Sequence, residues 1–166
     1  MSGAESTIAM PIAEKGILYW YAGPVMTDEG STYNEMIAVN PDGSGDITNT
    51  NVIWKKQDKQ SQNQMLTPVI KDELIYTINT RNILMCIDAS NGEEVWSTRV
   101  KSNFNASPLF IDGNIWFFSV KGEVLVIKAG RQYEVISQNQ LDSGIWATPA
   151  VVRASMIVRT ENYLYR

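Results

Sequence analysis

The fold is decided by a stretch that recurs along the chain, Thr67-Pro-Val-Ile-Lys-Asp-Glu-Leu-Ile-Tyr76. It aligns with Ser107-Pro-Leu-Phe-Ile-Asp-Gly-Asn-Ile-Trp116 and with Thr148-Pro-Ala-Val-Val-Arg-Ala-Ser-Met-Ile157. A looser copy begins at Met10-Pro-Ile-Ala-Glu-Lys-Gly-Ile-Leu-Tyr19. In every copy an aromatic or large apolar residue stands eight positions after the proline. Self-similarity at a fixed spacing predicts a chain built from repeated structural units.

The spacing of the prolines gives the length of the unit. Pro68, Pro108 and Pro149 lie 40 and 41 residues apart, and Pro11 lies 57 residues before Pro68. We therefore predict four units of roughly 40 residues, the usual length of a propeller blade, of which the first carries an insertion.

Within a unit the pattern is that of short strands and tight turns. The third unit predicts strands at 109–111, 115–120, 123–128 and 133–137, with an Asp112-Gly113 hairpin turn between the first two. β-branched and aromatic residues dominate these runs, and no long stretch shows helical periodicity. The prediction is an all-β chain, a β-propeller of about four blades with four antiparallel strands each. A sandwich of irregular strands is the alternative.

The predicted blades span residues 8–58, 63–101, 104–140 and 145–166, and residues 1–7 are predicted to be a disordered segment or an expression remnant. The last blade is short of its fourth strand, so we expect an incomplete ring. An open sheet edge has to be covered or paired. Two partners could do this, namely a missing N-terminal half or a second copy of the chain, and an oligomer is expected.

A tryptophan motif connects the chain to a known family. Ala89, Gly92 and Trp96 fill the Ala-x-x-Gly-x-x-x-Trp pattern that docks neighbouring blades in PQQ-like (quinoprotein-like) propellers, and Trp54 with Gly45 repeats part of it. In the third unit Gln132 and Ile136 take the places of the glycine and the tryptophan.

The stretches 43–54 and 148–166 also resemble bacterial secreted proteins of PQQ-like repeats. Relatives in that family include the barrel-assembly propeller lipoprotein of the bacterial outer membrane and the quinone-dependent alcohol dehydrogenases. Complete propellers of the family are about twice as long, so the chain resembles a C-terminal half.

Composition narrows the chemistry. Of 166 residues none is histidine and one, Cys86, is cysteine, which excludes His-based catalysis and an internal disulfide within this chain. The net charge of −4 gives no basic surface for nucleic acid, which is not expected as a partner. The longest apolar runs, such as 115–120, are too short for a membrane span.

The resemblance raises the question of a quinone cofactor. Quinoprotein dehydrogenases hold PQQ with a calcium ion bound by Glu and Asn, an Asp base and, in many, an adjacent cysteine pair. A chain with only Cys86 lacks that pair, and Cys86 aligns with Val126, which predicts a small buried side chain. We therefore predict no catalytic or cofactor-binding residue, and no PQQ, in this chain.

One loop has a weak metal-binding pattern. Asn40, Asp42 and Ser44, followed by Asp46, follow the oxygen spacing of an EF-hand calcium loop, but Asn51 replaces its bidentate Glu. A polar turn between two strands is the favoured interpretation.

The expected function is therefore a binding or scaffold propeller without enzymatic activity, periplasmic or secreted in its full-length form although no export signal is visible. Trp146, in the loop that leads to the last blade, is the candidate ligand-facing aromatic for a protein or glycan. The alternatives are a fragment of a PQQ-dependent dehydrogenase or other propeller enzyme, and a carbohydrate-binding propeller.

Overall fold

The computed structural model describes residues 9–26, 30, 32–58 and 66–166. The prediction for residues 1–7 lies outside these ranges. The described residues form four antiparallel sheets in chain order, three of four strands and one of three, and no helix. The strands are β1 (Ile12–Glu14), β2 (Ile17–Met26), β3 (Thr32–Val39), β4 (Val52–Asp58), β5 (Val69–Lys71), β6 (Leu74–Ile78), β7 (Ile83–Asp88), β8 (Glu94–Arg99), β9 (Leu109–Ile111), β10 (Asn114–Phe118), β11 (Glu123–Lys128), β12 (Val135–Gln140), β13 (Ala150–Val152), β14 (Ser155–Arg159) and β15 (Leu164–Tyr165).

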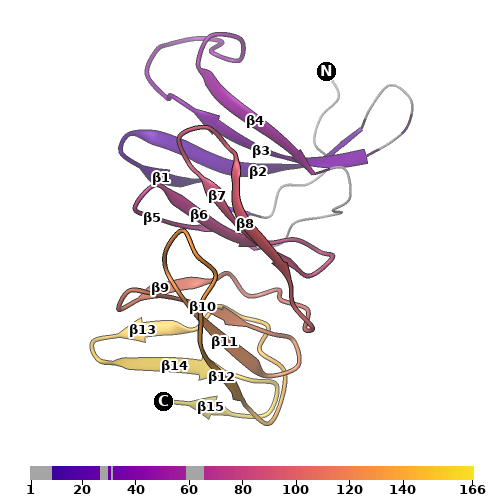
Figure 1. Cartoon of the computed structure of the whole chain (residues 1–166), viewed down its shortest axis with the longest axis vertical. Coiled ribbons are helices and arrows are strands. Elements are labelled where there is room, and N and C mark those ends of the chain that lie inside the picture. Colours follow the sequence, from indigo (N-terminus) through magenta and orange to yellow (C-terminus); the bar gives the residue numbers. More distant parts are fainter. Residues whose placement is uncertain (1–8, 27–29, 31, 59–65) are drawn as a thin grey trace.

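The four sheets stand side by side in an open arc, each twisted like a propeller blade (Figure 1). We call them blade 1 (β1–β4), blade 2 (β5–β8), blade 3 (β9–β12) and blade 4 (β13–β15). The first strands approach one another, since β1 contacts β5 and β5 contacts β9. The predicted fold class is therefore confirmed: the chain is an incomplete β-propeller.

The recurring proline stretch forms the inner hairpin of every blade. The residue one position after the proline pairs with the residue eight positions after the proline, as in Val69↔Tyr76 and Ala150↔Ile157. The two turn residues have positive φ in the first three blades, for example +48° at Asp112 and +79° at Gly113. Such turns match the right-handed twist of the flanking strands, which explains the Asp-Gly pair in the sequence.

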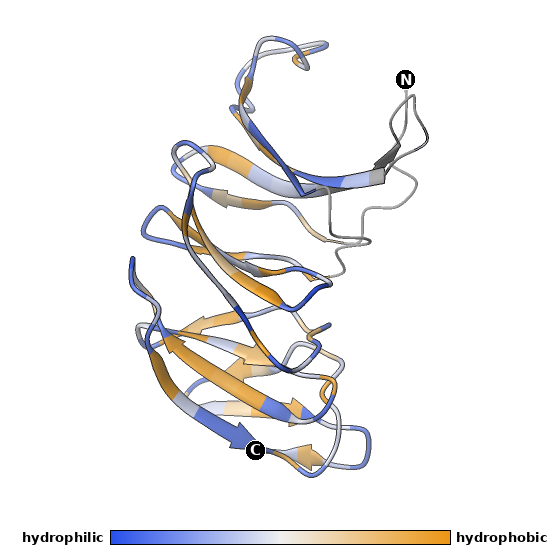
Figure 2. Cartoon of the chain, turned by 45° about the vertical axis from the view of Figure 1, so that its right-hand side comes forward, coloured by the Kyte–Doolittle hydropathy of each residue, from blue (hydrophilic) through white to orange (hydrophobic). Residues whose placement is uncertain are grey.

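Hydrophobic cores fill the spaces between blades. The third strands of blades 2 and 3 are apolar on both faces, and Figure 2 shows hydrophobic residues concentrated on the strands in the middle of the arc. In β11, Leu125 and Ile127 belong to the core between blades 2 and 3, whereas Val124 and Val126 belong to the core between blades 3 and 4. Blades 2 and 3 are thus each held by burial against two neighbours, and blades 1 and 4 by burial against one.

The outer strand of blade 3 departs from the prediction. A strand was expected at 133–137, but β12 covers Val135–Gln140, because a turn closed by the Lys128 amide donating to the Glu134 carbonyl at 2.9 Å occupies the preceding residues. Ser137 therefore lies opposite Val126, the place that Trp96 takes opposite Cys86. Ile136, aligned with the tryptophan by sequence, is 50% exposed.

In the described part of the chain, no helix is long and apolar enough to cross a membrane.

Candidate functional site

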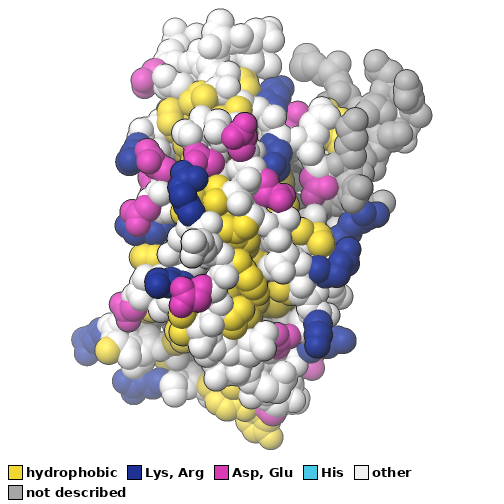
Figure 3. Space-filling view, viewed as in Figure 1, with side chains coloured by type: hydrophobic (Ala, Val, Ile, Leu, Met, Phe, Trp, Pro, Cys, Tyr) yellow, Lys and Arg dark blue, Asp and Glu magenta, His cyan; other side chains and the backbone are white. Residues whose placement is uncertain are grey.

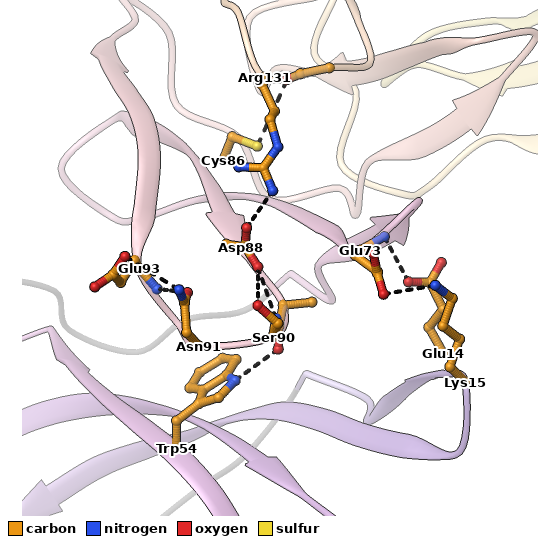
Figure 4. Close-up of polar contacts among 12 residues, drawn as sticks. Glu14, Lys15, Trp54, Glu73, Cys86, Asp88, Ser90, Asn91, Glu93 and Arg131 are labelled. Carbon is orange, nitrogen blue, oxygen red and sulfur yellow. Dashed lines mark hydrogen bonds and ion pairs between the residues drawn. The ribbon is translucent and has the colours of Figure 1, made fainter.

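Trp54 joins blade 1 to blade 2 (Figure 4). Its indole Nε1 donates a hydrogen bond to the Ala89 carbonyl at 2.8 Å, and its ring lies on Gly92, where an added Cβ would be 2.7 Å from the indole. Gly92 has φ of +76°, so glycine is needed both for the turn and for the close approach. The Trp54 ring also packs against Tyr19, with the centroids 6.0 Å apart.

Trp96 joins blade 2 to blade 3 in the same way. Its Nε1 donates to the Gly130 carbonyl at 3.1 Å, and its ring lies 5.3 Å from that of Tyr133. The Gly130 amide in turn donates to the Tyr76 hydroxyl at 2.7 Å. Each tryptophan therefore docks on the turn of the following blade, so that Trp54, and not Trp96, occupies the turn formed by Ala89 and Gly92.

Gly45 is the corresponding candidate in blade 1. It also has φ of +76°, but nothing lies within 4 Å of the position where its Cβ would be. The turn is present, and no ring from the described residues packs on it.

The loop with the calcium pattern is held by its own hydrogen bonds. The Asn40 Oδ1 accepts from the Asp42 amide and the Asp46 Oδ1 accepts from the Thr48 amide, each at 3.0 Å. The hydrogen bonds from Thr48 lower the pKa of Asp46. The Asn51 side-chain amide closes the loop by donating to the carbonyls of Asn40 and Asp42. Ser44 lies exposed in the same loop.

Two of the four candidate calcium ligands thus use a side-chain oxygen as an internal cap. Within the described ranges, no group of three or more His, Cys, Asp or Glu residues could hold a metal ion. The calcium site stays a prediction, and the observed bonds are those of an ordinary polar turn.

Between blades 2 and 3 lies a polar cluster around Asp88 (Figure 4). Its carboxylate accepts hydrogen bonds from the Ser90 hydroxyl at 2.6 Å and from Arg131 at 2.5 Å. These bonds, the one from Ser90 first, lower the pKa of Asp88. Arg131 comes from the turn of blade 3, so the ion pair spans the junction between the two blades.

Cys86 lies beside this cluster and is fully buried. Burial raises the pKa of its thiol to about 12, so it is not a nucleophile at neutral pH. A thiol enclosed in the third strand between two blades does not fit the exposed cysteine pair of a quinone site.

A second polar contact clamps blade 1 to blade 2 at their inner hairpins (Figure 4). The Glu14 carboxylate accepts hydrogen bonds from the backbone amides of Asp72 and Glu73 at 3.1 and 2.9 Å. Lys15 forms an ion pair with Glu73 at 2.7 Å between exposed side chains. Both contacts join structural elements, and their side chains line a small cavity of about 180 Å³ between the two blades.

Trp146 is the predicted aromatic that lies at the surface. Its side chain is 55% exposed, and its Nε1 donates to the Glu161 carboxylate at 3.0 Å. Together with Arg159 and Thr160 these residues line a cavity of about 330 Å³. The hydrogen bond holds the indole beside the cavity, and a ligand at Trp146 stays a prediction. Arg159 and Glu161 were missed by sequence reasoning, although the repeat alignment already sets Arg159 against apolar residues in blades 2 and 3.

The surface around these sites is mixed in charge. On the face drawn in Figure 3, basic and acidic side chains alternate around a band of hydrophobic side chains that runs over the middle blades.

Comparison with known proteins agrees with this geometry. A family model described as outer membrane protein assembly factor BamB matches residues 35–133. A curated protein of that name from Marinobacter adhaerens is 24% identical over 99 residues, which are 59% of this chain and 25% of that protein.

Solved structures show the same fold. BamB from Moraxella catarrhalis superposes with a TM-score of 0.61 at 17% identity, over 95% of this chain and 53% of that one. The quinohemoprotein alcohol dehydrogenase from Comamonas testosteroni gives 0.58 at 15% identity, over 84% and 22%. The computationally designed Ika4 protein gives 0.60 at 11% identity, over 98% and 94%.

The chain spans about half the length of the BamB structure and a quarter of the curated relative. Because the family model covers more than half of the chain, the protein belongs to the PQQ-like repeat family described as outer membrane protein assembly factor BamB.

Proposed function

We propose that this protein is a scaffold without enzymatic activity that binds other proteins in a bacterial extracytoplasmic compartment. The observation that carries the proposal is membership of a family described as an assembly factor of the outer membrane. The expected extracytoplasmic location rests on the same relatives.

The binding surface that we propose surrounds Trp146. An exposed indole fixed by Glu161, with Arg159 beside it, combines an apolar platform with a charged rim. Tryptophan and arginine are the residue types that most often dominate the energy of protein–protein contacts. A cavity of about 330 Å³ is large enough for one or two side chains of a partner.

Site-specific cross-linking tests this proposal. A photoreactive amino acid replaces Trp146 in the chain exported to the periplasm of a Gram-negative host, and a matched variant carries it at Ile53, an exposed residue of blade 1 (49%). We expect defined adducts with outer membrane or periplasmic proteins at position 146 and none at position 53. Adducts at both positions, or at neither, would contradict the proposal.

A carbohydrate-binding propeller is the competing function, because an exposed indole also stacks on sugar rings. A glycan array probed with the wild type and with Trp146→Ala separates the two. Glycan binding that disappears in the variant, together with an absence of protein adducts, would replace the protein-scaffold proposal.

A further inference from the structure

Each blade presents one face to the blade that follows it, and six positions of the repeat make up this forward face. In blades 1–3 all six are apolar or aromatic side chains within the cores between blades. They are Ala9, Ile12, Tyr19, Tyr21, Met36 and Ala38 in blade 1, then Leu66, Val69, Tyr76, Ile78, Leu84 and Cys86 in blade 2, then Ala106, Leu109, Trp116, Phe118, Val124 and Val126 in blade 3.

Blade 4 breaks the pattern at two of the six positions. The register of the strands places Arg159 where blades 2 and 3 have the fully buried Ile78 and Phe118, since Arg159 pairs with Leu164 as Ile78 pairs with Leu84. Two residues further on, Arg166 takes the place of Cys86. Its Nε donates to the Ser155 hydroxyl at 3.3 Å, which holds it on the same face.

The other four forward positions of blade 4 are apolar, and Leu164 is 72% exposed. The open forward face of blade 4, defined as Ala147, Ala150, Ile157, Arg159, Leu164 and Arg166, is therefore an apolar surface with two cations. In the described ranges, the side chain of Arg159 has neither a hydrogen bond nor an ion pair. A partner that buries this face must supply an aromatic ring or a carboxylate to each arginine.

At the opposite end of the arc, no other described blade covers the second face of blade 1 (Figure 1). Because Tyr19 and Tyr21 face blade 2 and side chains alternate along a strand, Leu18 and Trp20 face away from blade 2. Trp20 takes the position of Thr77 in blade 2, because Trp20 directly precedes Tyr21 and Thr77 directly precedes Ile78. Tyr21 and Ile78 are equivalent residues of the two forward faces.

The internal junctions show what these positions would touch. Thr77 of blade 2 forms a hydrogen bond with Tyr21 of the preceding blade. Thr77 is the equivalent of Trp20, and Tyr21 is the equivalent of Arg159. Phe117 of blade 3 likewise shares a core with Ile78 of blade 2. A blade 4 placed before a blade 1 would therefore set Arg159 against the Trp20 ring, a cation–π contact.

The second arginine has a matching carboxylate. Cys86, in the place of Arg166, lies with its Sγ 4.0 Å from the Gly130 carbonyl in the turn of the next blade. Ala38 and Val126 are equivalent because they pair with Tyr19 and Trp116. Four residues after each of them, Asp42 of blade 1 takes the place of Gly130. The Asp42 side chain is exposed, and its carboxylate has no hydrogen bond or ion pair within the described ranges.

We propose that the forward face of blade 4 docks on the open face of blade 1 of a second copy of this chain, with Arg159 on Trp20 and Arg166 paired to Asp42. The contact continues the interface already formed three times within the chain. The chain covers 53% of the length of the BamB structure that it superposes on, so two copies with that curvature would close one ring. A closed two-fold arrangement forms this contact twice.

The junction between copies is weaker than the junctions within the chain, because it lacks one hydrogen bond of a series from backbone amides to side-chain hydroxyls. The amides of Met10, Thr67 and Ser107 each donate, at 2.9 Å, to the side-chain hydroxyl of Thr67, Ser107 and Thr148 in the following blade. In the docked pair the next donor of the series is the backbone amide of Thr148, and the residue opposite it is Met10 of the second copy, which has no hydroxyl. The association is therefore reversible, and Met10→Thr is expected to tighten it several-fold by completing the ladder.

Sedimentation equilibrium of the full chain at micromolar concentrations tests the proposal through a charge swap. We expect a dimer for the wild type and a roughly tenfold or greater loss of affinity for Arg166→Asp alone and for Asp42→Arg alone, because each puts like charges together at both contacts. Mixing the two variants restores one opposite pair at each contact, so a heterodimer of near wild-type affinity is expected.

Lys121→Glu, an exposed turn residue of blade 3, is the control for a change of charge elsewhere and should leave the dimer intact. Thermal melts of each variant verify that it is folded, since all the substituted side chains are exposed. A wild type that stays monomeric overturns the proposal, and so does a dimer that resists both substitutions or a mixture that fails to re-form one.

Discussion

The junction between blades 2 and 3 and the open end of blade 4 use the same repeat positions for opposite purposes. At the junction, Ile78 and Cys86 are fully buried and Trp96 is docked on the next turn. At the end, the same two positions hold Arg159 and Arg166, and both side chains are exposed. The register of the paired strands is the same in the two regions, so they differ in side-chain chemistry and in whether a further blade covers the face.

The internal faces gain free energy from apolar burial, and an indole docks at the junctions between blades 1 and 2 and between blades 2 and 3. The end face of blade 4 carries two cations instead, and in the proposed dimer it selects its partner by charge. If that is correct, substitutions at the junctions should change stability strongly, and substitutions at the end should change it little.

The largest effect is expected at a docking tryptophan. Trp96→Ala removes the ring contacts with Tyr76 and Tyr133 and the hydrogen bond to Gly130, and should lower the free energy of unfolding by about 3 kcal/mol. Trp146→Ala makes the same change at the exposed end and should cost less than about 1 kcal/mol. Urea unfolding followed by circular dichroism measures both. Equal losses would show that the two regions do not differ as described.

A pair of glycines sharpens the comparison, because Gly92 and Gly45 have the same φ of +76° but different neighbours. Gly92→Ala combines backbone strain with a collision against the Trp54 ring and should destabilise by about 2–3 kcal/mol. Gly45→Ala meets no atom and should show only the strain, about 1 kcal/mol. The difference in urea midpoints reports the docked ring. If the two variants unfold together, Trp54 contributes little at this turn.

The smallest effect concerns the ion pair between blades 2 and 3. The folded pKa of Asp88 is lowered by Ser90 and Arg131, so its stabilisation is present above the pKa of the unfolded state and is lost as pH falls through the folded value. Asp88→Asn should therefore cost about 1 kcal/mol at neutral pH and almost nothing in strongly acidic solution. Unfolding curves of both proteins across the acid range test this. A difference that does not change with pH would assign the effect to packing instead.

Much of the architecture was predictable because its signals are local. The proline stretch marks the inner hairpin of each blade, and the Asp112-Gly113 pair specifies a turn of two positive φ values. Cys86 aligned with Val126 and is buried as expected. The outer strand of blade 3 was misplaced, because a turn without the glycine-tryptophan pattern gives no local mark of where the strand resumes.

The candidate sites were less predictable. Trp146 is exposed beside a cavity, and its role in facing a ligand stays a prediction. The residues around it, Arg159 and Glu161, come from another strand and turn. The sequence pattern places the turn glycine and the docking tryptophan in the same repeat. In the structure the ring of Trp54 packs on the turn of the next blade. Contacts between repeats depend on how sheets are stacked, which a single repeat does not encode.

By itself the sequence determined the repeat, the strand-rich class and the turns, because each depends on neighbours in the chain and on residues with restricted backbone angles. Only the tertiary structure decided which tryptophan docks on which glycine, that Gly45 has no ring upon it, and that Arg159 and Arg166 lie on a face that is buried elsewhere. These properties depend on the stacking of blades about 40 residues apart, where a side chain is buried or exposed according to whether another blade stands beside it.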